Sequence, residues 1–140
     1  MPFHPKRESY IHYEGRTFTA EWYYTEEGKL TALDYYRDLP LQDRTRLNYM
    51  IKHLCDSPRG TILPTTLYRI EDRENKIYAL KPRDERFFSF TTEGAKVIIT
   101  NAYHKHSQQM TRADLESLKI AGRYRQDYLK RVRGETYYEK

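Results

Sequence analysis

The chain has 140 residues, a length typical of one domain, and its 25 Lys and Arg outweigh 20 Asp and Glu to give a net charge of +5. Its 14 Tyr, 5 Phe and 1 Trp argue against a disordered chain, because disordered segments are poor in aromatic residues. The mild basic excess permits a nucleic-acid or acidic partner but does not demand one.

Cysteine usage and hydropathy exclude several classes of protein. A single cysteine, Cys55, cannot form an internal disulfide or a thiolate zinc site. No apolar run approaches the roughly 20 residues that span a bilayer, and the first residues lack the apolar segment of a signal peptide. We therefore expect no membrane association and a reducing, cytoplasmic location.

The first half of the chain predicts a strand followed by two helices. Residues 1–15 combine prolines, histidines and mixed charges, which indicates a loosely ordered N-terminal extension. Residues 16–24 are rich in β-branched and aromatic types and predict a strand. Apolar residues at helical spacing predict helices over residues 29–38 and 41–55, and Pro40 between them favours a helical hairpin.

From residue 61 the pattern becomes that of strands. Their connections are short, so they must pair antiparallel, because parallel strands need a crossover of about a dozen residues. The sequence therefore predicts a meander, whose strands fall at residues 67–70, 76–81, 86–92 and 95–103.

A basic helix is predicted over residues 112–133, where seven Lys or Arg face three acids. Thr111 is placed to cap it, with Asp114 three positions on. Gly122 weakens the helix and predicts a close approach to the sheet. Residues 134–140 have no core-forming pattern and are expected to be a tail.

Together these elements predict an α+β fold with one domain over residues 16–133. A small, mainly antiparallel sheet of four to five strands would carry two N-terminal helices and the basic C-terminal helix on one side. A sheet of this size with its helices can bury one modest core.

The richest cluster of chemistry-bearing side chains is the run Tyr103-His104-Lys105-His106, at the end of the last predicted strand. If the strand persists, Tyr103 and Lys105 point to one side and the two histidines to the other; if the chain has left the strand, all four can converge. Unperturbed histidines titrate near pH 6.5, roughly, and suit proton transfer. The histidine pair could also share a metal ion, but no acid follows in the loop and we expect no metal.

Three cations, Lys81, Arg83 and Arg86, flank a predicted turn between two strands. They could hold a phosphate and stabilise the charge that develops on it. The alternative is structural, since basic residues on edge strands often serve only to prevent aggregation. The basic helix is likewise either a solvated face or a contact for phosphates or an acidic protein segment.

Three segments resemble a known family: residues 77–82, 86–90 and 97–108, which read IYALKP, RFFSF and VIITNAYHKHSQ. They resemble the RelE/HigB-like toxins of type II toxin–antitoxin systems, in particular the phage-derived toxin-like branch. In that branch a strand ends in Leu-Arg or Leu-Lys, the next opens with Arg before aromatics, and a third runs into Asn-Ala-Phe-x-Lys-Lys-Ser-Gln. The resemblance covers roughly residues 16–131.

The resemblance implies a RelE-like sheet with two N-terminal helices that acts as a ribosome-dependent mRNA endonuclease, or mRNA interferase. Such toxins enter the ribosomal A site, where the 2′-hydroxyl of the mRNA attacks the adjacent phosphorus. The reaction needs a base, an acid and cations around the phosphate, with no metal or other cofactor. The implied partners are mRNA, ribosomal RNA and a cognate antitoxin, whose acidic helix or strand could cover the basic helix or the sheet edge.

Several residues match the family motifs. Arg86 matches the strand-opening Arg and Lys81 the basic residue that closes the previous strand, so both are expected at the phosphate, with Arg83 beside them. Lys105 matches the first Lys of the Lys-Lys pair and is expected at the phosphate or the transition state.

Other positions depart from the family. His106 stands where the family has its second Lys, and Tyr103 replaces the usual Phe, where it would stack on a base or pack. His104 occupies a variable position, so its role as acid or base is inferred from its own chemistry. The catalytic candidates are Arg86, Lys105, His104 and His106, and the RNA-binding candidates are Lys81, Arg83 and Tyr103.

Two alternatives remain open for the same fold. Some relatives poison gyrase, which predicts toxicity with intact mRNA. A phage or mobile-element binding module without catalytic activity would have a similar sequence.

Overall fold

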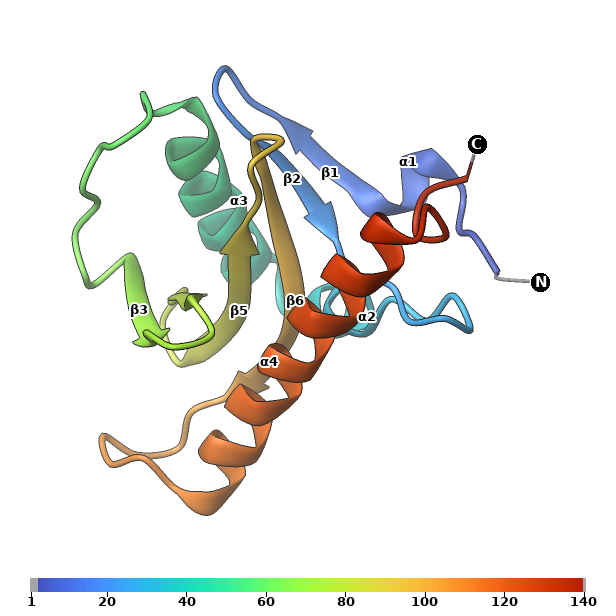
Figure 1. Ribbon diagram of the computed structural model, residues 1–140. Coiled ribbons are helices and arrows are strands. Elements are labelled where there is room, and N and C mark those ends of the chain that lie inside the picture. Colours follow the sequence, from blue (N-terminus) through green and yellow to red (C-terminus); the bar gives the residue numbers. More distant parts are fainter. Residues whose placement is uncertain (1–2, 140) are drawn as a thin grey trace.

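A six-stranded sheet with helices on both faces forms the protein in a computed structural model, which describes residues 3–139 (Figure 1). The strand order is β1-β2-β6-β5-β4-β3. In chain order the elements are α1 (Arg7–Tyr10), β1 (Ile11–Glu14), β2 (Thr19–Trp22), α2 (Thr31–Arg37), α3 (Leu41–Asp56), β3 (Tyr68–Asp72), β4 (Ile77–Leu80), β5 (Glu85–Thr91), β6 (Lys96–His104) and α4 (Arg112–Arg133).

The sheet is antiparallel except at one pair of strands. β2 and β6 run parallel, and the chain between them passes through α2, α3 and strands β3, β4 and β5. The predicted meander β3 to β6 pairs antiparallel throughout, as its short connections require. The α+β class and the mainly antiparallel sheet are therefore confirmed.

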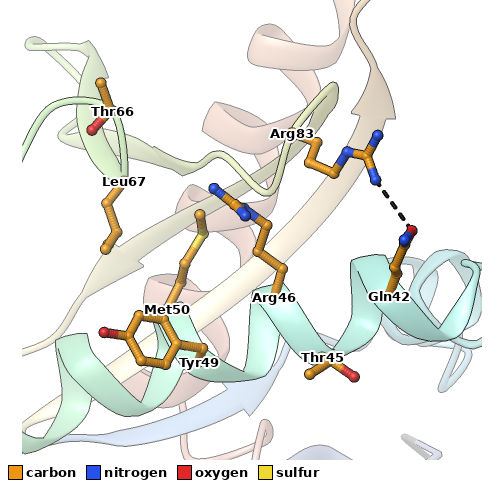
Figure 2. A pocket seen from close by; sticks show the side chains of 8 residues that line it. All are labelled: Gln42, Thr45, Arg46, Tyr49, Met50, Thr66, Leu67 and Arg83. Atoms are coloured by element: carbon orange, nitrogen blue, oxygen red, sulfur yellow. Dashed lines mark hydrogen bonds between the residues drawn. The ribbon is translucent and has the colours of Figure 1, made fainter.

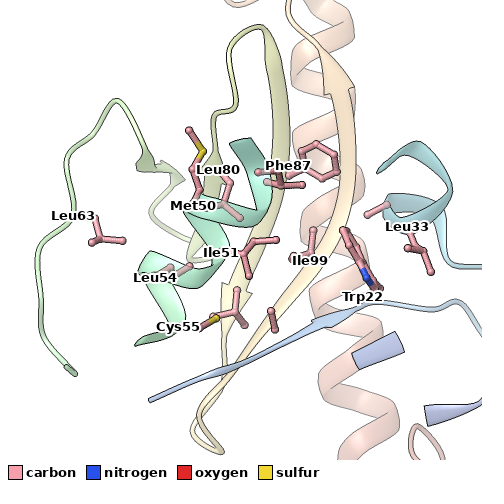
Figure 3. Packing of buried hydrophobic residues seen from close by; sticks show 14 residues of the cluster. Trp22, Leu33, Met50, Ile51, Leu54, Cys55, Leu63, Leu80, Phe87 and Ile99 are labelled. Carbon is pink, nitrogen blue, oxygen red and sulfur yellow. The ribbon is translucent and has the colours of Figure 1, made fainter. Parts of the chain in front are cut away.

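One face of the sheet packs against α2 and α3 (Figure 3). The apolar stripe of α3 meets Trp22, Phe87 and Ile99 from three neighbouring strands. Cys55 lies in this core with no exposed surface, and its burial raises the pKa of the thiol to about 12. It is a small buried hydrophobe, as its place beside Leu54 predicts.

The opposite face packs against α4, which crosses β6, β5 and β4. Its core is unusually rich in tyrosine: the Tyr24 and Tyr137 rings stack with centroids 4.2 Å apart, and Tyr128 packs edge-on against Tyr137 at 4.6 Å. The prediction that all helices lie on one side is therefore wrong. The molecule has two cores, one on each face of the sheet.

The N-terminal segment is more ordered than its composition indicates. Residues 1–15 are predicted to be loose, yet α1 and β1 lie within them, and only residues 1–2 fall outside the described range. β1 pairs antiparallel with β2, with Tyr13 opposite Ala20. It carries only four residues, IHYE, and backbone pairing stabilises it without a marked apolar alternation. The sheet thus has six strands where four to five are predicted. A short helix, α1, precedes the two predicted N-terminal helices.

The C-terminal residues 134–139 also belong to the fold, while Lys140 lies outside the described residues. After α4 the chain turns back at Glu135, which has a φ of +59°, and the amide of Thr136 donates to Arg131 O at 2.8 Å. This reversal buries Tyr137, which is 1% exposed, in the second core. The sequence predicts a tail here because two adjacent tyrosines make no periodic pattern.

Both long helices form where the sequence predicts them. Thr111 and Asp114 make a reciprocal capping box at the start of α4. Gly122 is buried, but the group it faces is the Asn75 side chain in the β3–β4 turn and not a strand of the sheet. Within residues 3–139, no helix has both the length and the apolar character that crossing a membrane requires.

Candidate RNA-binding and catalytic site

The predicted site residues gather at one end of the sheet, which we call the open end. It comprises the β4–β5 connection at residues 81–84, the start of β5 at residues 85–86, and the end of β6 with residues 105–106. The two parts are tied together, because the amide of Lys105 donates to Asp84 O at 2.7 Å. The sequence therefore brings its candidates into one region, as the strand connections predict.

A β-bulge decides which way the end of β6 faces. Between the pairs Ser89↔Ile99 and Phe87↔Ala102, β5 changes by two residues and β6 by three. The extra residue on β6 reverses the alternation of the strand beyond it, and bulges commonly re-aim side chains in this way. Asn101, in the bulge, donates from Nδ2 to Ser117 O at 2.9 Å and fixes the strand against α4.

The strand persists through His104, so the first of the two predicted geometries is found. Tyr103 lies on the side of α4, where it packs against the second core, and Lys105 also reaches α4. His104 and His106 lie together on the side of α2, with ring centroids 4.7 Å apart.

We call Lys81, Arg86 and Arg69 the cation cluster. Arg86 and Arg69 pair across the sheet with Tyr103 and Ala79 of the second core, which places them on the α4 side of the open end, and their charges act on Lys81. Burial and the positive charges of Arg86 and Arg69 lower the pKa of Lys81, and Glu71 partly opposes them. A lysine loses its proton more easily when neighbouring cations repel it. The cluster is therefore a place where a bound anion would lower the electrostatic energy.

Arg86 and Tyr103 lie opposite each other on β5 and β6. Arg86 donates from Nη1 to Arg83 O at 2.7 Å and to Glu85 O at 2.9 Å, which holds its guanidinium at the turn. Tyr103 is half-buried against Phe88, with ring centroids 5.5 Å apart, and burial followed by the charge of Asp114 raises its pKa to about 12. Tyr103 is thus a neutral, partly exposed ring beside the cations.

Lys105 is engaged in the protein itself. Its Nζ lies 2.9 Å from Asp114 Oδ2, and only 15% of the lysine side chain and 6% of the aspartate side chain are exposed. The same Asp114 oxygen accepts the amide of Thr111 at 3.0 Å. Lys105 therefore fastens the end of β6 to the start of α4, and its charge is already compensated.

His104 is held by a buried carboxylate that sequence reasoning missed. Its Nδ1 lies 2.8 Å from Glu85 Oε2, and the Tyr35 hydroxyl donates to Glu85 Oε1. The hydrogen bond to Glu85 raises the pKa of His104. Glu85 opens β5 directly opposite His104, a pairing that the register of β5 and β6 sets and that no sequence motif marks.

The arrangement assigns a tautomer and a protonation preference to His104. With Nδ1–H donated to Glu85, Nε2 remains on the exposed side of a ring whose side chain is 45% exposed. A histidine whose pKa is raised keeps its proton to a higher pH, and it can give that proton to an oxygen that leaves with negative charge.

Arg83 stands apart from the cation cluster. Its Nη1 donates to Gln42 Oε1 on α3 at 3.3 Å, so its side chain lies on the other side of the turn from Lys81. Within residues 3–139 no three His, Cys, Asp or Glu side chains are grouped as a metal site would require.

Comparison with known proteins gives no further assignment. No protein-family model matches the chain, and no curated protein matches it either.

Proposed function

We propose that this protein is the toxin of a type II toxin–antitoxin system, an mRNA interferase that cleaves mRNA on the ribosome in the cytoplasm. The observation that carries the proposal is that one end of the sheet holds both groups: the cation cluster on its α4 side and, on its α2 side, a histidine held by a buried carboxylate. The two helices between β2 and β3 and the meander that follows support it, because the family resemblance implies the same order of elements.

In the proposed reaction the 2′-oxygen forms a bond to phosphorus while the bond from phosphorus to the 5′-oxygen breaks. The proposal places the scissile phosphate across the end of the sheet, so that Lys81 and Arg86 stabilise the negative charge on its non-bridging oxygens from the α4 side and the histidines reach it from the α2 side. His104 donates its proton to the leaving 5′-oxygen, and His106 accepts the proton of the 2′-hydroxyl. The products are a 2′,3′-cyclic phosphate and a free 5′-hydroxyl.

The remaining candidates have supporting roles in this proposal. Tyr103 offers a ring for a base next to the scissile phosphate. Lys105 is a positioning residue, because its ammonium is bound to Asp114 and its part is to hold β6 against α4. The cognate antitoxin would inhibit the toxin by covering the cations or the basic face of α4.

The test is cleavage of an mRNA bound to purified ribosomes, with the new 5′ ends mapped by primer extension. We expect the wild-type protein to cut within translated codons. Arg86→Ala should lower the rate at least about 100-fold, because it removes a cation that acts on the transition state. Lys6→Ala is the matched control, since Lys6 is exposed just before α1 and belongs neither to the candidate site nor to the basic helix.

Three results would overturn the proposal. Unchanged cleavage by Arg86→Ala would remove the phosphate role of the cluster. Growth arrest on induced expression without new 5′ ends would indicate a protein target such as gyrase. No arrest from a folded product would indicate a binding module.

A further inference from the structure

A cavity of about 620 Å³ lies on the α3 side of the open end, between α3, the β4–β5 turn and the segment before β3 (Figure 2). Met50 and Leu67 give it apolar walls, and Arg46 and Arg83 stand on its rim. Its volume falls in the range of small-ligand sites, roughly 300–1,000 Å³.

The described lining residues include two arginines and no acid. Arg83 reaches Gln42 through a single hydrogen bond of 3.3 Å, which leaves most of its five N–H donors without a partner shown in the structure. Arg46 is exposed on α3. An arginine guanidinium binds phosphate with two parallel hydrogen bonds and also stacks on flat rings.

An aromatic residue completes the cavity. Tyr49 is 66% exposed, a large value for an aromatic side chain on a helix that otherwise buries its apolar stripe. Its ring lies parallel to that of His53, at an angle of 14° with centroids 6.2 Å apart. Exposed aromatic rings are the usual platforms for bases of single-stranded nucleic acid.

The cavity borders the proposed reaction site. Arg83 belongs to the same turn as Glu85, the carboxylate that holds His104. The negative charge of Asp43, which neighbours Gln42 on α3, acts on His104 and helps to raise its pKa. The Arg83 carbonyl accepts a hydrogen bond of 2.7 Å from the Arg86 guanidinium, and this bond connects the two sides of the turn.

We infer that this cavity binds one nucleotide of single-stranded RNA, next to the nucleotides at the cleaved bond. Arg46 and Arg83 bind its phosphate, and its base lies against Met50 and the Tyr49 ring. The inference rests on the proposed function for its substrate class. It adds a subsite on the α3 face, separate from the cation cluster on the α4 face.

The test is the affinity of a short, fluorescein-labelled single-stranded RNA, measured by fluorescence anisotropy without ribosomes at several salt concentrations. Arg83→Gly is the sharpest variant, because residue 83 has a φ of +57°, a conformation that glycine adopts without strain. It removes the side chain while keeping the turn. We expect weaker binding and a salt slope lower by about 1, the change produced by losing one phosphate contact.

Two further variants separate charge from stacking. Arg46→Gln should lower the salt slope in the same way, and Tyr49→Leu should weaken binding about tenfold without changing the slope. Tyr49→Phe should bind like the wild-type protein, since it retains the ring. Lys6→Gln, which removes an exposed cation outside the basic helix and the cavity, is the control for net charge.

The inference is overturned if Arg46→Gln, Arg83→Gly and Tyr49→Leu all bind RNA within twofold of Lys6→Gln. It is also overturned if a glutamate-rich peptide binds more tightly than the RNA and depends on the same arginines, which would make the cavity a protein-binding site. Ribosomal cleavage separates this outcome from failure of the proposed function. If the wild-type protein cleaves mRNA but the cavity variants bind RNA normally, only the proposed subsite is refuted. If the protein binds RNA through the cavity but does not cleave mRNA, only the proposed catalytic activity is refuted.

Discussion

Two histidines of this protein are expected to titrate on opposite sides of the value for a free histidine, about 6.5. Glu85 raises the pKa of His104, whereas burial lowers the pKa of His12. In an NMR titration the His104 ring should therefore change above that value and the His12 ring below it. Glu85→Gln should move only the pKa of His104 back toward the free value.

The sign of the stability effect follows from the same shifts. The His104 pKa is raised on folding, so its interaction with Glu85 stabilises the protein fully below the unfolded pKa and is lost as pH rises through the folded pKa. His12 behaves in the opposite sense, and its contribution is lost as pH falls through its lowered pKa. A His104 ring that titrates below the free value would contradict the assigned hydrogen bond.

The residue chemistry of the site was partly predictable. Spacing placed the cations and the histidines at one end of the sheet, because short connections bring neighbouring strand ends together. The bulge in β6 was not visible, since one extra residue leaves no mark in the composition yet decides the side to which His104 points. Glu85 was missed because its importance comes from register, not from a motif.

At the scale of elements, the ion pair between Lys105 and Asp114 links the end of β6 to the start of α4. Lys105→Ala leaves the Asp114 carboxylate buried with its amide partner but without a counter-charge. We expect a loss of about 3 kcal/mol in the free energy of unfolding, as for other broken buried pairs. Urea denaturation measures it. A variant that loses cleavage while keeping full stability would restore a direct role for Lys105 at the phosphate.

Replacing either of two glycines by alanine is expected to change the stability of the protein, in opposite directions. A Cβ on Gly122 would meet Asn75 Nδ2 at 3.5 Å, an ordinary contact, so Gly122→Ala should stabilise α4 by about 0.5–1 kcal/mol. A Cβ on Gly15 would lie 2.6 Å from Cys55 Cβ and 2.7 Å from Cys55 O. Gly15→Ala should therefore destabilise the protein by about 1–3 kcal/mol, because the β1–β2 hairpin must move away from α3. Thermal unfolding of both variants checks the two signs.

Helices and strands are predicted more accurately where the apolar pattern in the sequence is longer. α3 and α4 repeat an apolar stripe over several turns, and the structure has them where the pattern indicates. α1 and β1 have four residues each, too few for a period to be recognised. β1 forms because β2 and α3 offer it partners, and α1 packs against β1.

At the scale of the whole molecule, the two ends of the chain close the second core together. His4 Nδ1 lies 2.9 Å from Tyr137 O, and the Arg131 guanidinium sits over the Tyr137 ring, 4.6 Å from its centroid. The Tyr138 hydroxyl donates to the buried Glu21 at 2.7 Å. Tyrosines from distant parts of the sequence meet here, so no local window of the sequence contains the pattern.

Two substitutions of Tyr137 are therefore expected to destabilise the whole fold to different extents. Tyr137→Phe keeps the packed ring but removes the hydroxyl that accepts the buried amide of Tyr24 at 3.1 Å, which should cost about 1–3 kcal/mol. Tyr137→Ala also empties the space between Tyr24, Tyr128 and Arg131, and it should cost about 3–5 kcal/mol, the usual loss for a buried aromatic side chain. Equilibrium unfolding in urea gives both values. Equal and small losses would mean that residues 134–139 lie on a complete core, whereas the expected order means that the core is built only when the C-terminal segment folds back over β2.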